Sequence, residues 1–185
     1  MDTIPQTCRD EPAAWVRRFA ALIPSGGRVL DLACGHGRHA RFLAAAGHAV
    51  EAVDRDAAAL AGLAEVAGVV TRCADLEDGP WPYYGHAFDG VVVTNYLHRP
   101  LLPNLMNALA EGGVLIYETF MVGNERFGRP SDPAYLLRPG ELLDLVRKHF
   151  AVVAFEQGEV AAPRPAAIQR ICALRGNRFS LPISP

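Results

Sequence analysis

The sequence has little lysine, no excess of charge and no long apolar run. Lys148 is the single lysine among 18 basic residues, which face 20 acidic residues and leave a formal net charge of -2. A charge so close to zero gives no electrostatic reason to bind nucleic acid or an anionic membrane. No apolar stretch approaches the length needed to span a bilayer. We therefore expect neither a nucleic-acid partner nor a membrane partner.

Cysteines are few and scattered. They form no C-x-x-C pair, and the sequence has no disulfide framework of the kind found in small secreted domains. Their positions are Cys8, Cys34, Cys73 and Cys172. The first twelve residues, MDTIPQTCRDEP, also show neither the basic nor the apolar region of a secretory signal. These absences predict reduced cysteines and a cytoplasmic location.

What the chain does contain is a regular alternation of short apolar runs and amphipathic segments. Five strands are expected at 28–33, 48–54, 68–75, 88–96 and 112–120. Helices are expected at 11–23, 37–47, 55–67, 99–112 and 140–150. Two closing strands, 151–160 and 166–176, are expected to form an antiparallel pair. This order predicts an α/β fold, in which a doubly wound, mostly parallel sheet has helices on both faces.

The length of 185 residues suits a single domain, 1–185, with its N-terminal helix inside 1–25. For that helix we expect Asp10 as the cap and Pro12 in the first turn. The segment 120–140 is rich in glycine, proline and arginine and has little periodicity, so we expect a substrate lid loop there. The tail 177–185 is expected to fray.

The most informative stretch is VLDLACGHGRHA, residues 29–40. Gly35 and Gly37 fit a dinucleotide-binding fingerprint, in which glycines let the backbone approach a ligand at a helix N-terminus. Asp31, however, would repel a pyrophosphate at that turn. A ligand with a cationic group removes the conflict, and the methionine part of S-adenosylmethionine (SAM) carries an ammonium. Asp31 is expected to hold that ammonium, directly or through water.

Two more acidic residues end the next two strands. Asp54 can accept hydrogen bonds from both hydroxyls of a ribose, although a nicotinamide dinucleotide site would place an acid there too. Asp75 can accept from the amino group of adenine, and Leu76 beside it can pack on the purine. Asp31 and Asp75 together favour SAM over a dinucleotide.

The segments VLDLACGHGRHA, VEAVD, ADLED and FDGVVVTNYLH resemble, in order and spacing, the class I SAM-dependent methyltransferases. The resemblance covers the chain from Gly26 onward and implies a seven-stranded sheet with a reversed last strand, SAM as the cofactor, and an enzyme. It also implies cofactor contacts at Ala33 and Asn95. Ala33 stands where the family often has glycine, which is tolerable if its φ stays negative. The single-domain form and DLACGHGRHA look most like the tellurite-resistance and thiopurine methyltransferase-like branch.

Catalytic candidates follow the fourth strand. Methyl transfer from a sulfonium needs a base only to remove a proton from the acceptor. His98 suits that role because its unperturbed pKa lies near neutrality; equally, it can cap the next helix or contact the cofactor. Tyr96 is expected to line the acceptor pocket. Two prolines follow this turn in relatives that methylate planar amino groups, and Tyr96-Leu97 stands here instead, which argues against such acceptors.

Further residues can reach an acceptor. Glu118 ends the fifth strand beside Tyr117, for which core packing is the favoured role. In the 120–140 loop, four residues could grip an anionic or thiol acceptor, although solvated arginines are the more ordinary interpretation. These four are Asn124, Arg126, Arg129 and Tyr135.

A metal site and two other functions are alternatives to a SAM-dependent methyltransferase. Cys34, His36 and His39 match no common zinc spacing, so we expect no metal site, with Cys34 buried, His36 in a loop and His39 on a helix surface. The alternative functions are a NAD-dependent oxidoreductase and a non-catalytic SAM-binding protein. The absence of a basic stripe or appended recognition domain favours a small-molecule methyl acceptor. The acceptor's identity and the oligomeric state cannot be predicted from this sequence.

Overall fold

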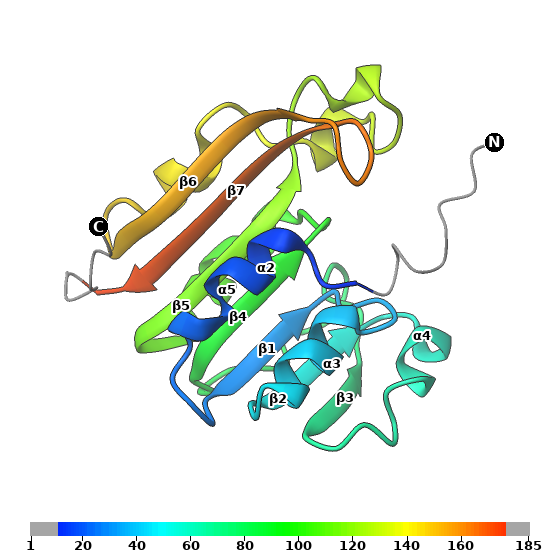
Figure 1. The fold of residues 1–185 in the computed structure, drawn as a ribbon, viewed down its shortest axis with the longest axis vertical. Helices are drawn as coiled ribbons and strands as arrows, with labels where there is room; N and C mark the ends of the chain where they lie inside the picture. The colour runs from blue at the N-terminus through cyan, green and yellow to red at the C-terminus, as the bar shows by residue number, and fades with distance from the viewer. Residues whose placement is uncertain (1–10, 177–185) are drawn as a thin grey trace.

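Seven strands form one mixed sheet in the order β3-β2-β1-β4-β5-β7-β6 (Figure 1). The structure is a computed structural model of the chain, and it describes residues 11–176. The strands are β1 (Arg28–Leu32), β2 (Ala49–Asp54), β3 (Val69–Cys73), β4 (Phe88–Thr94), β5 (Leu109–Phe120), β6 (Phe150–Val160) and β7 (Ala166–Arg175). The first five strands pair in parallel, whereas β7 runs antiparallel to both β5 and β6. The predicted doubly wound sheet with a reversed last strand is confirmed.

Helices cover both faces of this sheet (Figure 1). They are α2 (Ala14–Phe19), α3 (Arg38–Ala45), α4 (Ala57–Ala61), α5 (Leu102–Asn107) and α6 (Glu141–Val146). Four 3-10 turns join them: η1 (Ala20–Leu22), η2 (Arg99–Leu101), η3 (Asn124–Arg126) and η4 (Pro133–Tyr135). The apolar side chains of α2, α3 and α4 belong to one core cluster, and those of α5 and α6 belong to the cluster on the opposite face.

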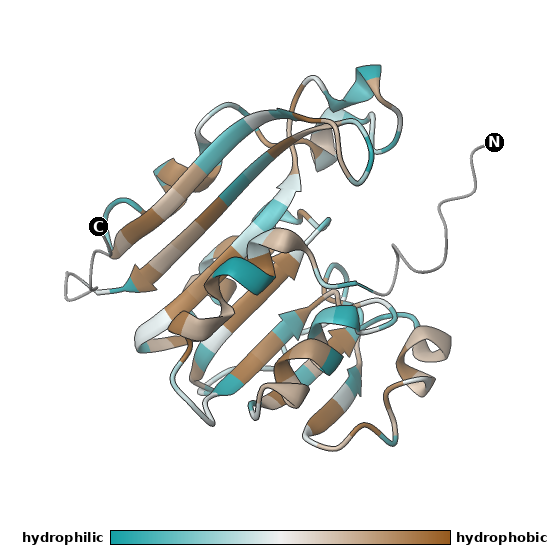
Figure 2. Cartoon of the chain, viewed as in Figure 1, coloured by the Kyte–Doolittle hydropathy of each residue, from teal (hydrophilic) through white to brown (hydrophobic). Residues whose placement is uncertain are grey.

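The central strand β4 shows why the sheet is buried on both sides. Val91, Val92 and Val93 are all fully buried, and because successive side chains alternate between faces, Val92 joins one cluster while its two neighbours join the other. Such a run without alternation is typical of a strand covered on both faces. The apolar colour is concentrated on these central strands in Figure 2.

Several helices are shorter than predicted. The first helix has Ala13 as its N-cap, so Pro12 precedes it, and Asp10 lies outside the described residues. After Asp54, helical structure covers 57–61, and the Asp56 side chain caps it by accepting hydrogen bonds from two backbone N–H groups. Pro103 lies in the first turn of α5, which a 3-10 turn precedes.

The segment 121–140 is ordered. It contains η3 and η4 and returns to the sheet, where Met121 bridges Leu137. The predicted fraying at 177–185 lies outside the described residues. Within residues 11–176, no helix is long and apolar enough to cross a membrane.

Candidate functional site

The glycine turn follows β1 and is the tightest part of the site. Ala33, Gly35 and Gly37 all have positive φ angles, of 53°, 55° and 74°. The expectation that Ala33 keeps a negative φ is therefore wrong. The chain must reverse at once after the strand, and the Cys34 N–H is held by the Val53 carbonyl at 3.0 Å, which leaves Ala33 in the left-handed region. Strain of this kind, roughly 1 kcal/mol or more for a residue with a Cβ, is found at functional turns.

Gly35 and Gly37 are needed for different reasons. A Cβ on Gly37 would collide with the Leu63 side chain, so this glycine allows the turn to pack against the residues after α4. A Cβ on Gly35 would meet nothing within 4 Å, so the space beside that residue is open. The turn therefore presents an accessible backbone at Gly35, as a ligand-binding turn requires.

Asp54 is attached to this turn. Its Oδ2 accepts a hydrogen bond from the Gly35 N–H at 2.8 Å, and its Oδ1 accepts from the Asp56 N–H at 3.0 Å. Two backbone donors thus fix the carboxylate at the end of β2. Each carboxylate oxygen can accept more than one hydrogen bond, so Asp54 keeps capacity for two ligand hydroxyls.

Asp75 is held in a similar way beyond the end of β3. Its Oδ1 accepts from the backbone N–H of Glu77 at 2.9 Å and of Asp78 at 3.3 Å. These bonds lower the pKa of Asp75, and the neighbouring Arg55 and His98 side chains act in the same direction. Asp75 is therefore ionised, and His98 lies near enough to be felt by it.

A pocket of about 200 Å³ opens between these strand ends. Its lining brings together five of the predicted site residues with three others; the eight are Ala33, Asp54, Arg55, Ala74, Asp75, Leu76, Glu77 and Tyr96. The sequence reasoning missed Arg55 and Glu77, although each stands within two residues of a predicted strand-end carboxylate. Three of the eight lining residues are acidic (Asp54, Asp75 and Glu77) and one is basic (Arg55), so the lining is acidic on balance.

Asp31 lies below the turn and is almost completely buried, with 1% of its surface exposed. Its Oδ2 has no hydrogen-bond partner among the described residues. Burial raises the pKa of Asp31 to about 7, against the opposing effects of the Ala40 N–H and the Arg38 charge. An unpartnered buried carboxyl oxygen is costly, and a cation bound beside it would remove that cost.

The turn after β4 carries the catalytic candidates. Asn95 is exposed, has a φ of 55°, and its N–H donates to the Glu118 carbonyl at 2.9 Å. The Tyr96 hydroxyl is buried with no hydrogen-bond partner in the described part of the chain. Burial, followed by the charges of Glu77 and Asp75, raises the pKa of Tyr96. Its phenol is therefore kept as a donor and is poorly suited to act as a base.

His98 is half-buried at the N-cap of η2. Its side chain makes no capping hydrogen bond, so the helix-cap interpretation is wrong. Tyr117 behaves as expected for a core residue: it is buried, and its hydroxyl donates to the Tyr96 carbonyl at 2.9 Å. Glu118 accepts from Arg170 at 3.2 Å.

His39 differs from its prediction. It is buried, Nε2 accepts from the Ala13 N–H at 3.1 Å, and Nδ1 lies 3.4 Å from the Thr94 hydroxyl. Burial lowers the pKa of His39 to about 3, so the ring is neutral. Its expected place on a helix surface is wrong because the segment before α2 packs over the start of α3. Cys34 is buried and His36 exposed, and no group of three or more potential ligands is arranged for a metal within residues 11–176.

The four loop candidates have separate environments. Asn124 is buried, donates to the Pro130 carbonyl at 2.9 Å and accepts from the Ala167 N–H at 3.2 Å. Its side chain therefore maintains the loop and is not available to grip an acceptor, as it could have been from the sequence alone. Arg126 is exposed and pairs with Glu159 at 2.6 Å. Arg129 and Tyr135 are exposed.

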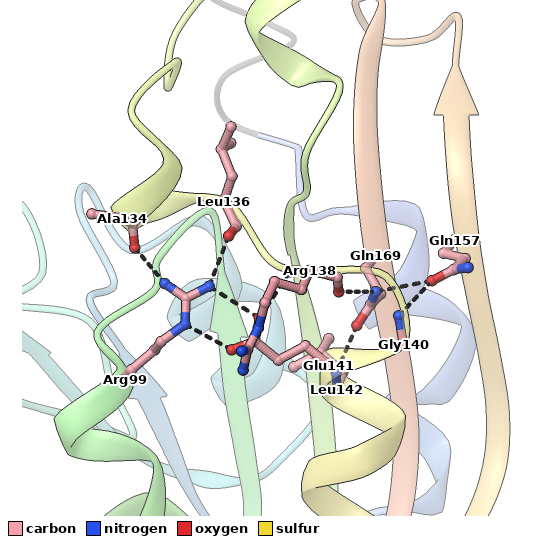
Figure 3. A network of polar contacts seen from close by, with 9 residues as sticks. All are labelled: Arg99, Ala134, Leu136, Arg138, Gly140, Glu141, Leu142, Gln157 and Gln169. Atoms are coloured by element: carbon pink, nitrogen blue, oxygen red, sulfur yellow. Dashed lines mark hydrogen bonds and ion pairs between the residues drawn. The ribbon is translucent and has the colours of Figure 1, made fainter.

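A polar network joins the 121–140 loop to the turn after β4 (Figure 3), and no pattern in the sequence indicates it. Arg99 binds both carboxylate oxygens of Glu141, 42 residues away. Buried Gln169 binds the start of α6. Neither contact has a local sequence signal, because the partners meet only through the fold.

Comparison with known proteins bears on this site. Residues 29–113 match the family described as "Methyltransferase domain". A 113-residue stretch is 35% identical to a protein-L-isoaspartate O-methyltransferase of Chlorobaculum tepidum, over 56% of this chain and 49% of that protein. The chain thus spans about half the length of this curated relative.

Solved structures share the fold. TehB from Haemophilus influenzae superimposes with a TM-score of 0.72 at 20% identity, over 90% of this chain and 63% of TehB. A SAM-dependent methyltransferase from Mesorhizobium loti gives 0.67 at 21% identity, over 88% of this chain and 98% of the other.

The matched residues 29–113 contain β1 to β4, the glycine turn, Asp54 and Asp75, which are the elements that build the pocket. The strand order and the reversed β7 complete the same architecture. Over residues 29–113 the chain is similar to a methyltransferase domain, and its fold is shared by solved SAM-dependent methyltransferases.

Proposed function

We propose that this chain is an enzyme that transfers a methyl group from SAM to a small-molecule acceptor. The observation that carries the proposal is the set of three strand-end carboxylates, of which Asp31 keeps an unpartnered buried oxygen beside the glycine turn. The similarity to TehB favours the tellurite-resistance and thiopurine methyltransferase-like branch.

The residues present fit SAM part by part. Asp31 would hold the ammonium, and Asp54, whose carboxylate is aligned by Gly35 and Asp56, would accept the ribose hydroxyls. Asp75 would accept the adenine amino group while Leu76 packs on the ring. When bound, SAM supplies a methyl group already activated by its sulfonium, so the protein's task is to position the acceptor and exclude water.

The chain's own chemistry centres on the β4 turn. His98 is half-buried, lies near the ionised Asp75, and would take the proton that the acceptor loses. Tyr96 and Asn95 would line the pocket. Tyr96 is assigned a hydrogen-bond donor role, because its phenol is held protonated by burial and by neighbouring carboxylates.

A nicotinamide dinucleotide is the weaker alternative. Its diphosphate would lie at the glycine turn, beside a pocket whose lining carries the carboxylates of Asp54, Asp75 and Glu77 against the single positive charge of Arg55. Titration calorimetry with SAM, S-adenosylhomocysteine and NADH separates the two. We expect both adenosyl compounds to bind and NADH not to bind; the reverse pattern would replace this function with an oxidoreductase.

The acceptor needs a second experiment. Release of S-adenosylhomocysteine would be measured with 2-mercaptoethanol, thiophenol, catechol, benzylamine and selenite, and with an isoaspartyl peptide because of the curated relative's name. Turnover with one of the small molecules is expected. Turnover with the peptide alone would overturn the small-molecule assignment, and SAM binding without any turnover would favour a non-catalytic SAM-binding protein.

A further inference from the structure

Arg99 connects the turn after β4 to the end of the 121–140 loop and to the start of α6. It directly follows His98 and opens η2. Its Nε and Nη2 donate to the two Glu141 oxygens at 2.7 and 3.0 Å. Its Nη1 donates to the Ala134 carbonyl at 2.7 Å, and Nη2 donates also to the Leu136 carbonyl at 2.8 Å (Figure 3). One guanidinium thus ties the β4 turn to the end of the 121–140 loop and to α6.

Glu141 is well placed for this pairing. Its side chain is 10% exposed, and it also accepts from the Arg138 N–H at 2.8 Å. Burial alone would raise its pKa, but the hydrogen bonds from Arg99 and Arg138 lower the pKa of Glu141 to about 2. The pair is therefore ionised at any ordinary pH, and a two-point guanidinium–carboxylate contact fixes orientation as well as distance.

The end of the loop and the start of α6 are attached to the sheet through Gln169, a residue of β7. Its Oε1 accepts from the Leu142 N–H at 2.6 Å, and its Nε2 donates to the Arg138 carbonyl at 3.1 Å and to Gln157 at 3.0 Å. Gln157 in turn accepts from the Gly140 N–H at 2.9 Å. The end of the loop is thus rigidly held by β6 and β7, and Arg99 transmits that position to the β4 turn.

Tyr135 lies in the chain between Ala134 and Leu136, whose carbonyls accept hydrogen bonds from Arg99. This aromatic residue is 48% exposed, so its side chain is free to meet a ligand while its backbone is held on both sides. On the other segment, the Tyr117 hydroxyl holds the Tyr96 carbonyl, which leaves the half-buried His98 between two fixed points.

We propose that Arg99 is a positioning residue for the methyl acceptor, because its contacts with Glu141 and with the carbonyls around Tyr135 hold Tyr135 and His98 in one fixed arrangement. This inference rests on the proposed function, since it takes these two side chains to face the acceptor. Arg99 is not expected to touch the cofactor, whose pocket is lined by other residues. The acceptor site is then already formed before a ligand arrives.

Two variants test the proposal. Glu141→Gln keeps the shape of the side chain and removes its charge, whereas Arg99→Lys keeps a charge but has one nitrogen with three donors in place of the planar fork that makes four hydrogen bonds. The control is Asp144→Asn on the same helix, which removes an exposed pair with Arg147 whose side chains are 63% and 64% exposed. Such a pair has little effect on stability.

Hydrogen exchange supplies the first readout. In both test variants we expect the backbone amides of 95–99 and of 121–138 to exchange faster than in the wild-type protein. The exchange rates of residues 29–54 should stay unchanged, and the control variant should exchange as the wild-type protein does. Faster exchange confined to 134–146 would show that Arg99 merely stabilises the end of the loop and α6, and would overturn the proposal. This arm needs no ligand, so it stands even if the wild-type protein fails to bind SAM, an outcome that would remove only the proposed function.

Steady-state kinetics supply the second readout, with the best acceptor of the six-compound panel and well below the melting temperature. We expect KM for the acceptor to rise about tenfold, within the range that small misplacements produce, while KM for SAM stays within about twofold. Equal changes in both KM values, or wild-type constants in folded variants, would count against a positioning role.

Discussion

The Gly35 N–H donates a 2.8 Å hydrogen bond to Asp54 Oδ2, and so joins the glycine turn after β1 to the acidic end of β2. The turn that leaves open space beside Gly35 therefore also aligns the Asp54 carboxylate. We expect the two to act together in the proposed cofactor pocket.

We expect Asp54→Ala to weaken SAM binding by about tenfold to a hundredfold, because hydrogen bonds to a charged acceptor are lost and the Gly35 turn is released. Calorimetry with S-adenosylhomocysteine measures this. Asp89→Asn is the matched control: Asp89 also accepts a backbone N–H, from Arg28 at 2.8 Å, but lies at the opposite ends of the strands. Equal losses in both variants would indicate general destabilisation.

The free energy of unfolding should depend on Asp31. Its pKa is about 7 in the folded chain against a model-compound value of 3.8, so the folded state holds a proton that the unfolded state releases between these values. The apo protein should therefore lose stability as pH rises from about 4 to 7, by up to about 1.4 kcal/mol per pH unit from this group. Denaturant unfolding at pH 5 and pH 8 would reveal the slope, and Asp31→Asn should flatten it.

Cofactor affinity should show the opposite trend. Only the ionised Asp31 can pair with an ammonium, so SAM affinity is expected to rise as pH increases through 7. Calorimetry at pH 6 in two buffers of different ionisation enthalpy should detect proton release on binding. Methylthioadenosine, which lacks the amino-acid end, is the control, and an equal pH dependence for this compound would assign the effect elsewhere.

The positive φ of Ala33 predicts a small stabilising substitution. Ala33→Gly removes the steric strain of the left-handed conformation but increases the freedom of the unfolded chain, so the net gain should be at most about 1 kcal/mol. Ala44→Gly, within α3, should instead lose about 1 kcal/mol. Denaturant midpoints of the two variants should move in opposite directions.

Removal of the His98 imidazole should affect turnover and not cofactor binding. For His98→Gln we expect kcat to fall by about a hundredfold or more, as for loss of a general base, with unchanged affinity for S-adenosylhomocysteine. A variant that keeps full activity would exclude His98 as the base.

The order of elements and the approximate position of the pocket could be predicted because both follow local patterns. Each apolar run predicted its strand, and parallel strands bring their carboxyl ends to one edge, so Asp54 and Asp75 were expected to meet there. Helix lengths were overestimated after Asp54, where alanine-rich composition favours helix but the packed segment ends early.

Burial and long-range partners could not be predicted in the same way. Nothing near His39 in the sequence indicates that Ala13 and Thr94 enclose its ring, and nothing near Asn124 indicates the Ala167 N–H that makes it structural. Their residue types were correctly seen as polar and capable of chemistry, but their solvent exposure depends on segments many residues away.

The sequence by itself determined which groups stand at the strand ends, since that depends only on the alternation of apolar runs and on the residues that close them. The tertiary structure alone decided which polar side chains keep an atom without a hydrogen-bond partner. Asp31 keeps one, whereas Asn124 is bonded through both its amide nitrogen and its amide oxygen, and Arg99 pairs with Glu141 across 42 residues, because hydrogen-bond satisfaction depends on contacts that only the folded chain makes.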